Sequence, residues 1–455
     1  MESMLERMRR FFESGETQDC GFRIRSLRRL RRGIAENEPA LLEAVRMDLG
    51  KSAFEAYECE LLSVYREIDE SIRRLRSWSK PRRVKTPWYH FPAASRLYPE
   101  PLGVSLILSP WNYPFLLAVS PLVAAVSAGC CAVVKPSEDA PHTAAALEAL
   151  LTGCFEAEHV VCVQGGVCES ERLLALPFDK IFFTGSPRVG RIVMQAAARN
   201  LTPVTLELGG KSPCIVDETA DIALAAKRIL WGKTLGAGQT CVAPDYLLVH
   251  RSVKDALLQK LAEFSTAFYG ARPLENEDYP RIVNERHFDR LVGLLEAGRP
   301  QIVFGGGYDK ARLKIEPTAF ADLPPAHPLM EEELFGPLLP VLPVDSLQQA
   351  LDMVAARPKP LALYLFSNDA ARIKHVTRTA HFGGCCINDT VLHVNNHYLP
   401  FGGVGESGMG RYHGRRGFEA FSYEKAVLTN RRFPDLPIRY PPYGDKLGLL
   451  KRLVK

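Results

Sequence analysis

Short apolar runs rich in β-branched residues alternate with helical patterns between Gly103 and Leu208. The runs VSLIL, CAVVK, HVVCV, KIFFT and VTLEL are separated by stretches such as AAALEALL and VGRIVMQAAARN. Strands that alternate with helices form a parallel sheet whose two faces are both covered. This part of the chain is therefore predicted to be a doubly wound α/β domain, in which ligands bind at the carboxyl ends of the strands.

The segments on either side of this region have other patterns. The first eighty or so residues are predicted to be helical, and PRRVKTPWYHFPAASRLYPEP, broken by prolines, is predicted to be a linker or an outlying hairpin. After Gly210 the alternation resumes with a helix near Ile222–Trp231, a strand at YLLVH and a helix at VKDALLQKLAEF. We predict a second α/β domain that ends near Asn395, followed by an extended segment rich in Pro, Gly and Tyr.

Charge and composition exclude several classes of protein. The 455 residues carry a net charge of +5, and the basic stretch RIRSLRRLRRG has no aromatic module beside it, so it is interpreted as a solvated helix face rather than a nucleic-acid site. The acidic residues of the amino terminus argue against a targeting signal. No apolar run is long enough to span a bilayer, and the ending KLGLLKRLVK is interpreted as a surface helix.

The cysteines indicate a reducing compartment. There are eleven, an odd number, and they are scattered without paired Cys-x-x-Cys spacing. This pattern argues against a disulfide framework and a structural zinc site, and it predicts a cytoplasmic protein. No cluster of His, Cys, Asp and Glu has metal-ligand spacing, so no catalytic metal is expected.

Four stretches place polar groups where an open α/β sheet presents its chemistry. ILSPWNYP contains Asn112, FFTGSPRVG contains Gly185 and Ser186, LELGGKSP contains Glu207, and GAGQTCVAP contains Cys241. Taken singly, Asn112 could be a turn residue beside two prolines, and a single cysteine is more often inert than reactive. A carboxylate among the apolar neighbours of Glu207 needs a partner or a function. Their joint occurrence favours a catalytic site.

One phosphate-binding pattern is interpreted as a decoy. GVGESG, from Gly403 to Gly408, matches G-x-G-x-x-G, but no strand leads into it. We predict a tight connection beside the active site instead.

Together these motifs resemble the aldehyde dehydrogenases. SPWNYP, VVKPSE, FFTGSPRVG, LELGGKSP, GQTCVAPDY, EEELFGPLLPV and LPFGGVGESGMGRYHG follow one another in the family's order, over essentially the whole chain. GQTCVAPDY and GRYHG resemble the class 3 branch, which includes fatty-aldehyde and aromatic-aldehyde dehydrogenases. The resemblance implies oxidation of an aldehyde, of medium or long aliphatic chain or aromatic, to a carboxylic acid.

The resemblance also implies roles for single residues. Cys241 would be the nucleophile that forms a thiohemiacetal and then a thioester. Asn112 and the backbone N–H of Cys241 would stabilise the oxyanion, and Glu207 would activate the water that hydrolyses the thioester. Lys211 is interpreted as a surface or ion-paired lysine, and His413 is left outside the catalytic set.

The resemblance implies that Lys135 and Glu138 contact the adenosine ribose of a nicotinamide dinucleotide. An acid there favours free ribose hydroxyls, whereas Lys135 could tolerate a 2′-phosphate, so the predicted cofactor is NAD, with NADP left open. The turn at Gly185 and Ser186 precedes a helix whose amino end can receive the pyrophosphate. The predicted cofactor-binding residues are Trp111, Lys135, Glu138, Gly185, Ser186, Gly190, Leu208, Glu333 and Phe335. For Glu333 and Phe335 the alternatives are a helix-end acid and a core aromatic.

The family's architecture divides the chain into three parts. Residues 1–84 and 101–208 would form the Rossmann-like NAD(P)-binding domain, 209–395 the catalytic domain, and 85–100 with 396–455 a β bridging arm. The arm implies a homodimer. Three rival functions are an acylating dehydrogenase that passes the thioester to coenzyme A, a binding protein without turnover, and a cofactor-free esterase. Glu207 argues against the first, and the intact set of Asn112, Glu207 and Cys241 argues against the second.

Overall fold

The predicted apolar runs form the centre of a six-stranded sheet in the computed structural model, which describes residues 1–324 and 326–454. Its parallel strands lie in the order β7-β6-β3-β4-β5, and β17 pairs antiparallel with the outer edge of β7. The chain runs outward from β3 to β5 and then returns to the other side of β3. The switch point of the topology, where such sheets bind ligands, therefore lies between β3 and β6. The strands are β3 (Val104–Leu108), β4 (Cys131–Lys135), β5 (Val160–Cys162), β6 (Lys180–Gly185), β7 (Val204–Leu208) and β17 (Gly408–Met409).

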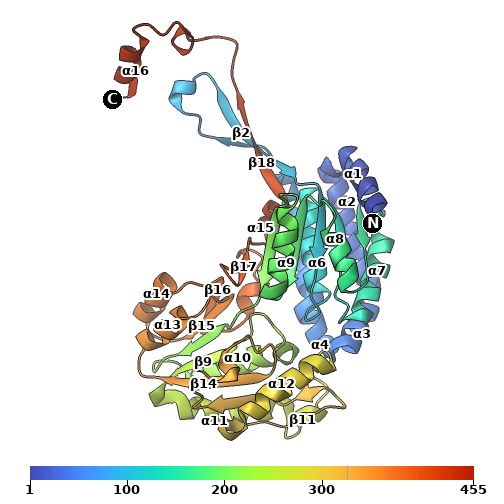
Figure 1. The fold of residues 1–455 in the computed structure, drawn as a ribbon, viewed down its shortest axis with the longest axis vertical. Coiled ribbons are helices and arrows are strands. Elements are labelled where there is room, and N and C mark those ends of the chain that lie inside the picture. The colour runs from blue at the N-terminus through green and yellow to red at the C-terminus, as the bar shows by residue number, and fades with distance from the viewer. Residues whose placement is uncertain (325, 455) are drawn as a thin grey trace.

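Helices cover both faces of this sheet (Figure 1). The core on one face includes side chains of α1 (Glu2–Glu13), α8 (Val167–Leu174) and α9 (Pro187–Ala198). The core on the other face includes side chains of α2 (Cys20–Glu36), α5 (Leu62–Trp78), α6 (Leu116–Ala128) and α7 (Pro141–Cys154). Every residue of α6 is buried, as expected for a helix that is apolar on all sides. Helix α3 (Glu38–Leu49) and the short α4 (Ala53–Ala56) complete this lobe.

The second predicted α/β domain is built on a seven-stranded sheet with the order β10-β13-β14-β9-β8-β15-β16. All neighbours are parallel except β10 and β13. The predicted strand YLLVH is β9 (Tyr246–His250) and the predicted helix after it is α11 (Lys254–Tyr269). The remaining elements are β8 (Pro213–Val216), α10 (Ile222–Thr234), α12 (Glu285–Ala297), β10 (Ile302–Phe304), β13 (Thr318–Ala321), β14 (Leu338–Val344), α13 (Leu347–Ala355), β15 (Ala362–Phe366), α14 (Ala370–Thr379) and β16 (Gly384–Ile387).

A three-stranded antiparallel arm projects from the lobe that contains the six-stranded sheet (Figure 1). Its strands are β1 (Arg82–Val84), β2 (Ala94–Pro101) and β18 (Ser422–Thr429), and β18 pairs with β2 along its whole length. The helix predicted at KLGLLKRLVK is α16 (Lys446–Val454), and it lies near the outer end of the arm (Figure 1).

The structure places the second part of the arm at Ser422 rather than at residue 396. Between these points the chain returns to the lobe that contains the six-stranded sheet. Gly408 pairs with Glu207, and helix α15 (Gly414–Ala420) packs against α5 and α6. Tyr412 and Phe421 are buried there, whereas the sequence predicted only an extended segment.

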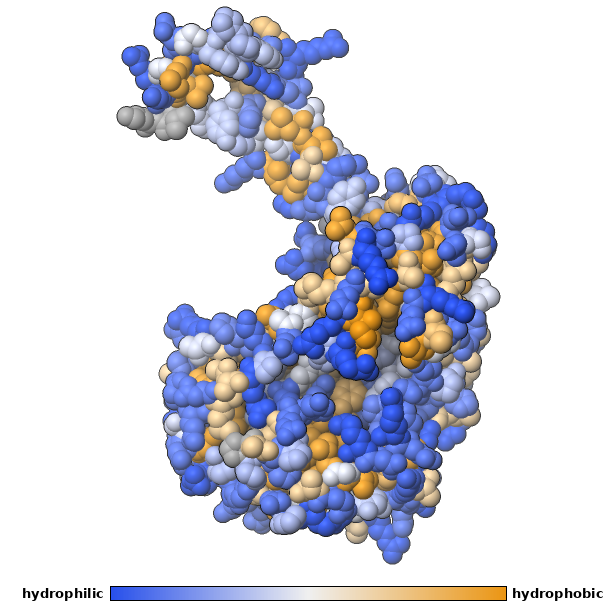
Figure 2. Space-filling view, in the orientation of Figure 1, coloured by the Kyte–Doolittle hydropathy of each residue, from blue (hydrophilic) through white to orange (hydrophobic). Residues whose placement is uncertain are grey.

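Apolar side chains are exposed along the arm (Figure 2). Phe91, Leu428 and Phe433 have 69%, 53% and 84% of their surface exposed. Within residues 1–324 and 326–454, no helix combines the length and apolar character needed to cross a membrane.

Candidate active site

A cavity of about 630 Å³ opens at the carboxyl ends of β3, β6 and β7 and extends to the second lobe. Nine of the twelve predicted site residues line it: Trp111, Asn112, Gly185, Ser186, Glu207, Leu208, Cys241, Glu333 and Phe335. Lys135, Glu138 and Gly190 are not part of its lining. The nine residues come from five separate segments of the chain, so only the fold brings them together.

Asn112 lies in the loop between β3 and α6 and is 4% exposed. Its side-chain amide donates a hydrogen bond to the backbone carbonyl of Gln239, two residues before Cys241, at 2.9 Å. An amide nitrogen has two hydrogens, so a second N–H remains to donate toward the cavity. The loop of Asn112 is thereby joined directly to the loop of the cysteine.

The loop before Cys241 explains the sequence GAGQTC. Gly236, Ala237 and Gly238 all have positive φ angles, of 57°, 54° and 77°. A side chain at Gly238 would also collide with the backbone carbonyl of Gly336, which an added Cβ would approach to 2.3 Å. Gln239 holds the turn by donating to the carbonyls of Gly236 and Arg281, at 2.8 and 2.9 Å. The strained turn presents Cys241 to the cavity.

The Cys241 thiol lies among groups that act on its charge in opposite directions. Burial raises the pKa of the thiol, and the carboxyl groups of Glu333 and Glu207 raise it further. The backbone N–H groups of Cys241 and Val242 lower it. Backbone amides at the sulfur are the donors that a thiolate or an adjacent oxyanion requires.

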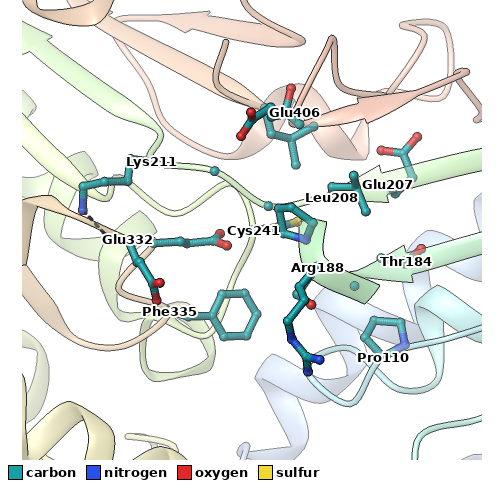
Figure 3. Close-up of a pocket in the computed structure, with 18 of the residues that line it drawn as sticks. Pro110, Thr184, Arg188, Glu207, Leu208, Lys211, Cys241, Glu332, Phe335 and Glu406 are labelled. Atoms are coloured by element: carbon teal, nitrogen blue, oxygen red, sulfur yellow. Dashed lines mark hydrogen bonds between the residues drawn. The ribbon is translucent and has the colours of Figure 1, made fainter. Parts of the chain in front are cut away.

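Glu207 is the most unusual carboxylate in the cavity. It is 3% exposed, and neither of its oxygens has a hydrogen-bond partner among the described residues. Burial raises its pKa well above the ordinary range, with only Arg411 acting in the opposite direction. In Figure 3 its carboxylate is turned away from Cys241. Burying a carboxyl group without hydrogen-bond partners lowers stability, so its presence here indicates a function. Its raised pKa suits a general base.

Glu333 and Phe335 are held on the opposite wall by a buried ion pair. Lys211 pairs with Asp245 and donates to the backbone carbonyl of Leu329 at 3.0 Å. It also donates to the backbone carbonyl of Glu332 at 2.8 Å (Figure 3). This confirms that Lys211 is an ion-paired lysine. Asp245 in turn accepts the N–H of Leu334 at 2.9 Å. Lys211 and Asp245 therefore fix the segment that contains both cofactor-binding candidates.

The amino end of α9 offers a place for a phosphate group. The Ser186 side chain caps the helix by accepting the N–H of Val189, and Pro187 occupies the first turn. Gly185, Ser186, Arg188 and Arg191 line the cavity, and Arg188 extends into it (Figure 3). The N–H groups of a helix start together with guanidinium groups bind anions well.

Other features of the cavity also fit a dinucleotide. The Thr184 hydroxyl is buried without a hydrogen-bond partner in the described parts of the chain. A side chain at Gly209 would overlap the Glu333 carboxyl group, so only glycine leaves this wall open. Trp111 lies 4.9 Å from the ring of His287 and 5.3 Å from that of Phe335, which gives one side of the cavity an aromatic surface.

The three predicted residues that do not line the cavity make contacts elsewhere in the same lobe. Lys135 donates to Glu138 at 2.8 Å at the end of β4, and Glu138 is half-exposed. Gly190 lies on α9, where an added Cβ would approach Leu208 Cδ2 to 2.7 Å, so glycine lets the helix pack closely on β7. The cofactor roles of these three residues, like those of the six that line the cavity, remain predictions.

Sequence reasoning missed several residues of the cavity. Arg188 lay within a motif that was examined for its glycine and serine, and His287 and Arg290 belong to α12, which contains none of the matched motifs. The segment around Glu406 and Ser407 lines the cavity as a tight turn on β7, as predicted for GVGESG. Among residues 1–324 and 326–454 no group of three or more His, Cys, Asp or Glu is placed to hold a metal.

Comparison with known families gives a match over residues 1–427, to the aldehyde dehydrogenase family. The chain belongs to this family. A Staphylococcus aureus 4,4'-diaponeurosporen-aldehyde dehydrogenase is 46% identical over 98% of this chain and 97% of its own length. A Rattus norvegicus "aldehyde dehydrogenase, dimeric NADP-preferring" is 42% identical over 97% and 98%.

Solved structures agree with this membership. The substrate-bound state of Staphylococcus aureus AldH has a TM-score of 0.98 and 45% identity, and the match covers 100% of this chain and 99% of the other. A Staphylococcus aureus betaine aldehyde dehydrogenase in complex with NAD+ has a TM-score of 0.86 and 28% identity, covering 96% and 89%. This aldehyde dehydrogenase is an NAD(P)-dependent oxidoreductase that converts aldehydes to carboxylic acids.

Proposed function

We propose that Cys241 is the nucleophile of this enzyme, that Asn112 and the backbone N–H of Cys241 stabilise the oxyanion, and that Glu207 is the general base. The observation that supports this assignment best is that the three side chains line one cavity, where Glu207 is a buried carboxyl group without a hydrogen-bond partner in the described chain. Each group is of the type that its step requires.

The first step forms a bond between the Cys241 sulfur and the carbonyl carbon of the aldehyde. The π electrons of the carbonyl move to its oxygen, where Asn112 and the backbone N–H of Cys241 donate to the new anion. A nicotinamide held in the cavity would supply the acceptor for a hydride, and loss of that hydride from the carbon bonded to Cys241 would leave a thioester. In the second step Glu207 takes a proton from water, the water oxygen bonds to the acyl carbon, and sulfur departs as the thiolate.

The residues present fit a nicotinamide dinucleotide. Lys135 and Glu138 would hold the adenosine ribose, the turn at Gly185 and Ser186 the pyrophosphate, and Glu333 the nicotinamide ribose. The Lys135–Glu138 ion pair supports NAD as the preferred cofactor. If the adenosine ribose binds here, the Glu138 carboxylate would repel the 2′-phosphate of NADP. The NADP preference in the name of the rat relative keeps NADP as the alternative.

The substrate is proposed to be an apolar aldehyde, of medium or long aliphatic chain or aromatic. The cavity is lined by apolar side chains that include Leu117, Leu361, Phe401 and Tyr412. The Staphylococcus aureus relative is named for 4,4'-diaponeurosporen-aldehyde.

Measuring NADH formation across a series of aliphatic chain lengths and aryl aldehydes tests the proposed substrate class. The value of kcat/KM should rise with the apolar surface of the aldehyde, by up to about 10-fold per pair of methylenes. A preference for short, polar aldehydes would contradict it.

The pH dependence of activity follows from the two raised pKa values. Cys241 and Glu207 must each lose a proton before they act, and burial raises the pKa of both. The ascending limb of the pH profile should therefore lie at higher pH than for exposed groups. We expect kcat, which includes both the thioester-forming and the hydrolytic half of the reaction, to rise from roughly pH 6 to pH 9 in steady-state assays. A profile that falls over this range would show that a protonated group is required instead.

The homodimer implied by the arm is also proposed. Strand β18 is the last strand of its sheet, so one edge is open in the described chain, and Leu428 on this strand is 53% exposed. Open edges and exposed apolar residues are features of interaction surfaces. The arm of one subunit would pair with a second copy, and the rat relative is named as dimeric.

A cytoplasmic location is also proposed, and the eleven free cysteines support it.

Replacing Leu428 with aspartate tests the dimer. A buried charge in the interface should raise the dissociation constant about 30-fold or more, which analytical ultracentrifugation measures. Leu201→Asp, at a leucine that is 89% exposed in the turn before β7, is the matched control and should remain dimeric. A wild-type protein that sediments as a monomer would exclude the proposal.

A further inference from the structure

A lysine and a glutamate form a fully buried ion pair outside the cavity lining. Lys51 Nζ lies 2.8 Å from Glu60 Oε1, and both side chains are 0% exposed. Lys51 follows the glycine that ends α3, and Glu60 belongs to a π-helical turn, Tyr57–Leu61, a type of turn that is frequent at functional sites. A buried ion pair is weak evidence for stability alone, because desolvation of its charges is costly.

The second contact of Lys51 is with the segment that contains Asn112. Its Nζ donates to the backbone carbonyl of Asn112 at 2.9 Å, and it lies 3.8 Å from the centre of the Tyr113 ring. The ammonium group therefore contacts two successive residues of the loop between β3 and α6.

Glu60 contacts the other end of the same loop. Its second carboxylate oxygen accepts the N–H of Phe115 at 2.8 Å and that of Leu116 at 3.4 Å, where α6 begins. Charge-assisted bonds to backbone N–H groups are among the stronger hydrogen bonds in proteins. The pair thus binds the loop on both sides of Tyr113, and all of these contacts are buried.

The loop held in this way is joined to the cysteine loop at two points. The Asn112 amide donates to the carbonyl of Gln239, and the Tyr113 hydroxyl lies 2.7 Å from Thr240 Oγ1. The segment between Lys51 and Glu60 also contacts the cysteine loop directly, because the Glu55 side chain accepts the N–H of Gly236 at 2.7 Å. The distance between the Asn112 amide and the Cys241 sulfur therefore depends on Lys51 and Glu60.

We propose that Lys51 and Glu60 are positioning residues that hold the Asn112 amide at the oxyanion site. They touch neither substrate nor cofactor and act through the backbone of the loop. A displacement of about 1 Å at a reacting centre can lower a rate about 10²-fold, so a pair that fixes this loop affects the chemical step. The inference rests on the proposed role of Asn112.

A double-mutant cycle tests the proposal. Lys51→Met should lower the single-turnover rate of NADH formation by about 10- to 100-fold, and Asn112→Ala by about 10²- to 10³-fold. If Lys51 acts through Asn112, the variant with both changes should be no slower than Asn112→Ala by more than about 3-fold. The KM for NAD should change by less than about 3-fold. A lowered single-turnover rate with a nearly unchanged KM is not what a general loss of structure would give.

A second variant and a control keep the test decisive. Removing one partner of a buried pair is destabilising, so Lys51→Met combined with Glu60→Gln, which removes both charges, is measured in the same way if the single variant does not fold. Lys180→Met is the control, because Lys180 is 4% exposed and bonds Thr205 at the opposite end of β6. It should retain the wild-type rate within about 3-fold.

The outcomes separate the two claims. An unchanged rate in the Lys51 variants, or a combined variant that loses the product of the two single effects, would overturn the positioning role. An unchanged rate in Asn112→Ala would instead overturn the proposed role of Asn112 and, with it, the positioning through that residue.

Discussion

Replacing Cys241 with alanine is expected to abolish aldehyde oxidation. The alanine variant has no group that can bond to the carbonyl carbon, so hydride has no tetrahedral intermediate from which to depart. Loss of a nucleophile that works together with a base costs about 10⁴-fold or more in rate. NADH formation measured at saturating aldehyde and cofactor should therefore fall below about 10⁻⁴ of the wild-type rate, and any esterase activity should disappear with it.

The other cysteines provide the control for this experiment. Cys168 is exposed on α8, away from the cavity lining, and Cys168→Ala should retain the wild-type rate. Binding of NAD to Cys241→Ala should persist, because the proposed cofactor contacts are made by other residues. Substantial NADH formation by the Cys241 variant would exclude this residue as the nucleophile.

Replacing Glu207 with glutamine is expected to separate the two halves of the reaction. Glutamine has nearly the same shape but cannot take a proton from water, so the thioester should form and then accumulate. Stopped-flow absorbance should show a burst of about one NADH per active site, followed by a steady-state rate lowered by about 10²- to 10⁴-fold.

A second buried carboxyl group provides the comparison for Glu207. Glu67 is 4% exposed, burial raises its pKa to about 7, and it accepts the N–H of Gly414 at 2.6 Å. Because Glu67 lies outside the cavity lining, Glu67→Gln should change stability without stalling turnover. If Glu207→Gln turns over at the wild-type steady-state rate, another group is the base.

Much of the fold could be predicted because its signal is local. The runs VSLIL, CAVVK and VTLEL became β3, β4 and β7 almost residue for residue, since buried parallel strands are continuous apolar stretches. The return of the chain between residues 396 and 421 could not be predicted in this way. Its pairing of Gly408 with Glu207 joins residues that are distant in sequence, and turn-forming residues leave no periodic pattern.

The candidate site was predicted from motifs, and its supports were not. Asn112 follows β3, Glu207 lies at the end of β7, and Cys241 lies in the glycine-rich loop between α10 and β9 rather than after a strand. Each belongs to a motif with nearby glycine or proline, which makes it visible in sequence. Lys51 and Glu60 lie in DLGKSAFEAYECE, where they look like ordinary helix-surface charges. Only burial and the contact with the Asn112 carbonyl distinguish them, and both depend on segments far along the chain.

Mass spectrometry of a stalled reaction tests the covalent route most directly. Glu207→Gln mixed with an aldehyde and NAD, quenched in acid and digested, should yield the peptide that contains Cys241 with the mass of the acyl group added. The peptides of the other ten cysteines should be unmodified. If NADH has formed while the Cys241 peptide carries no acyl group, the sulfur is not the atom that receives the aldehyde carbon, and the proposed mechanism is wrong.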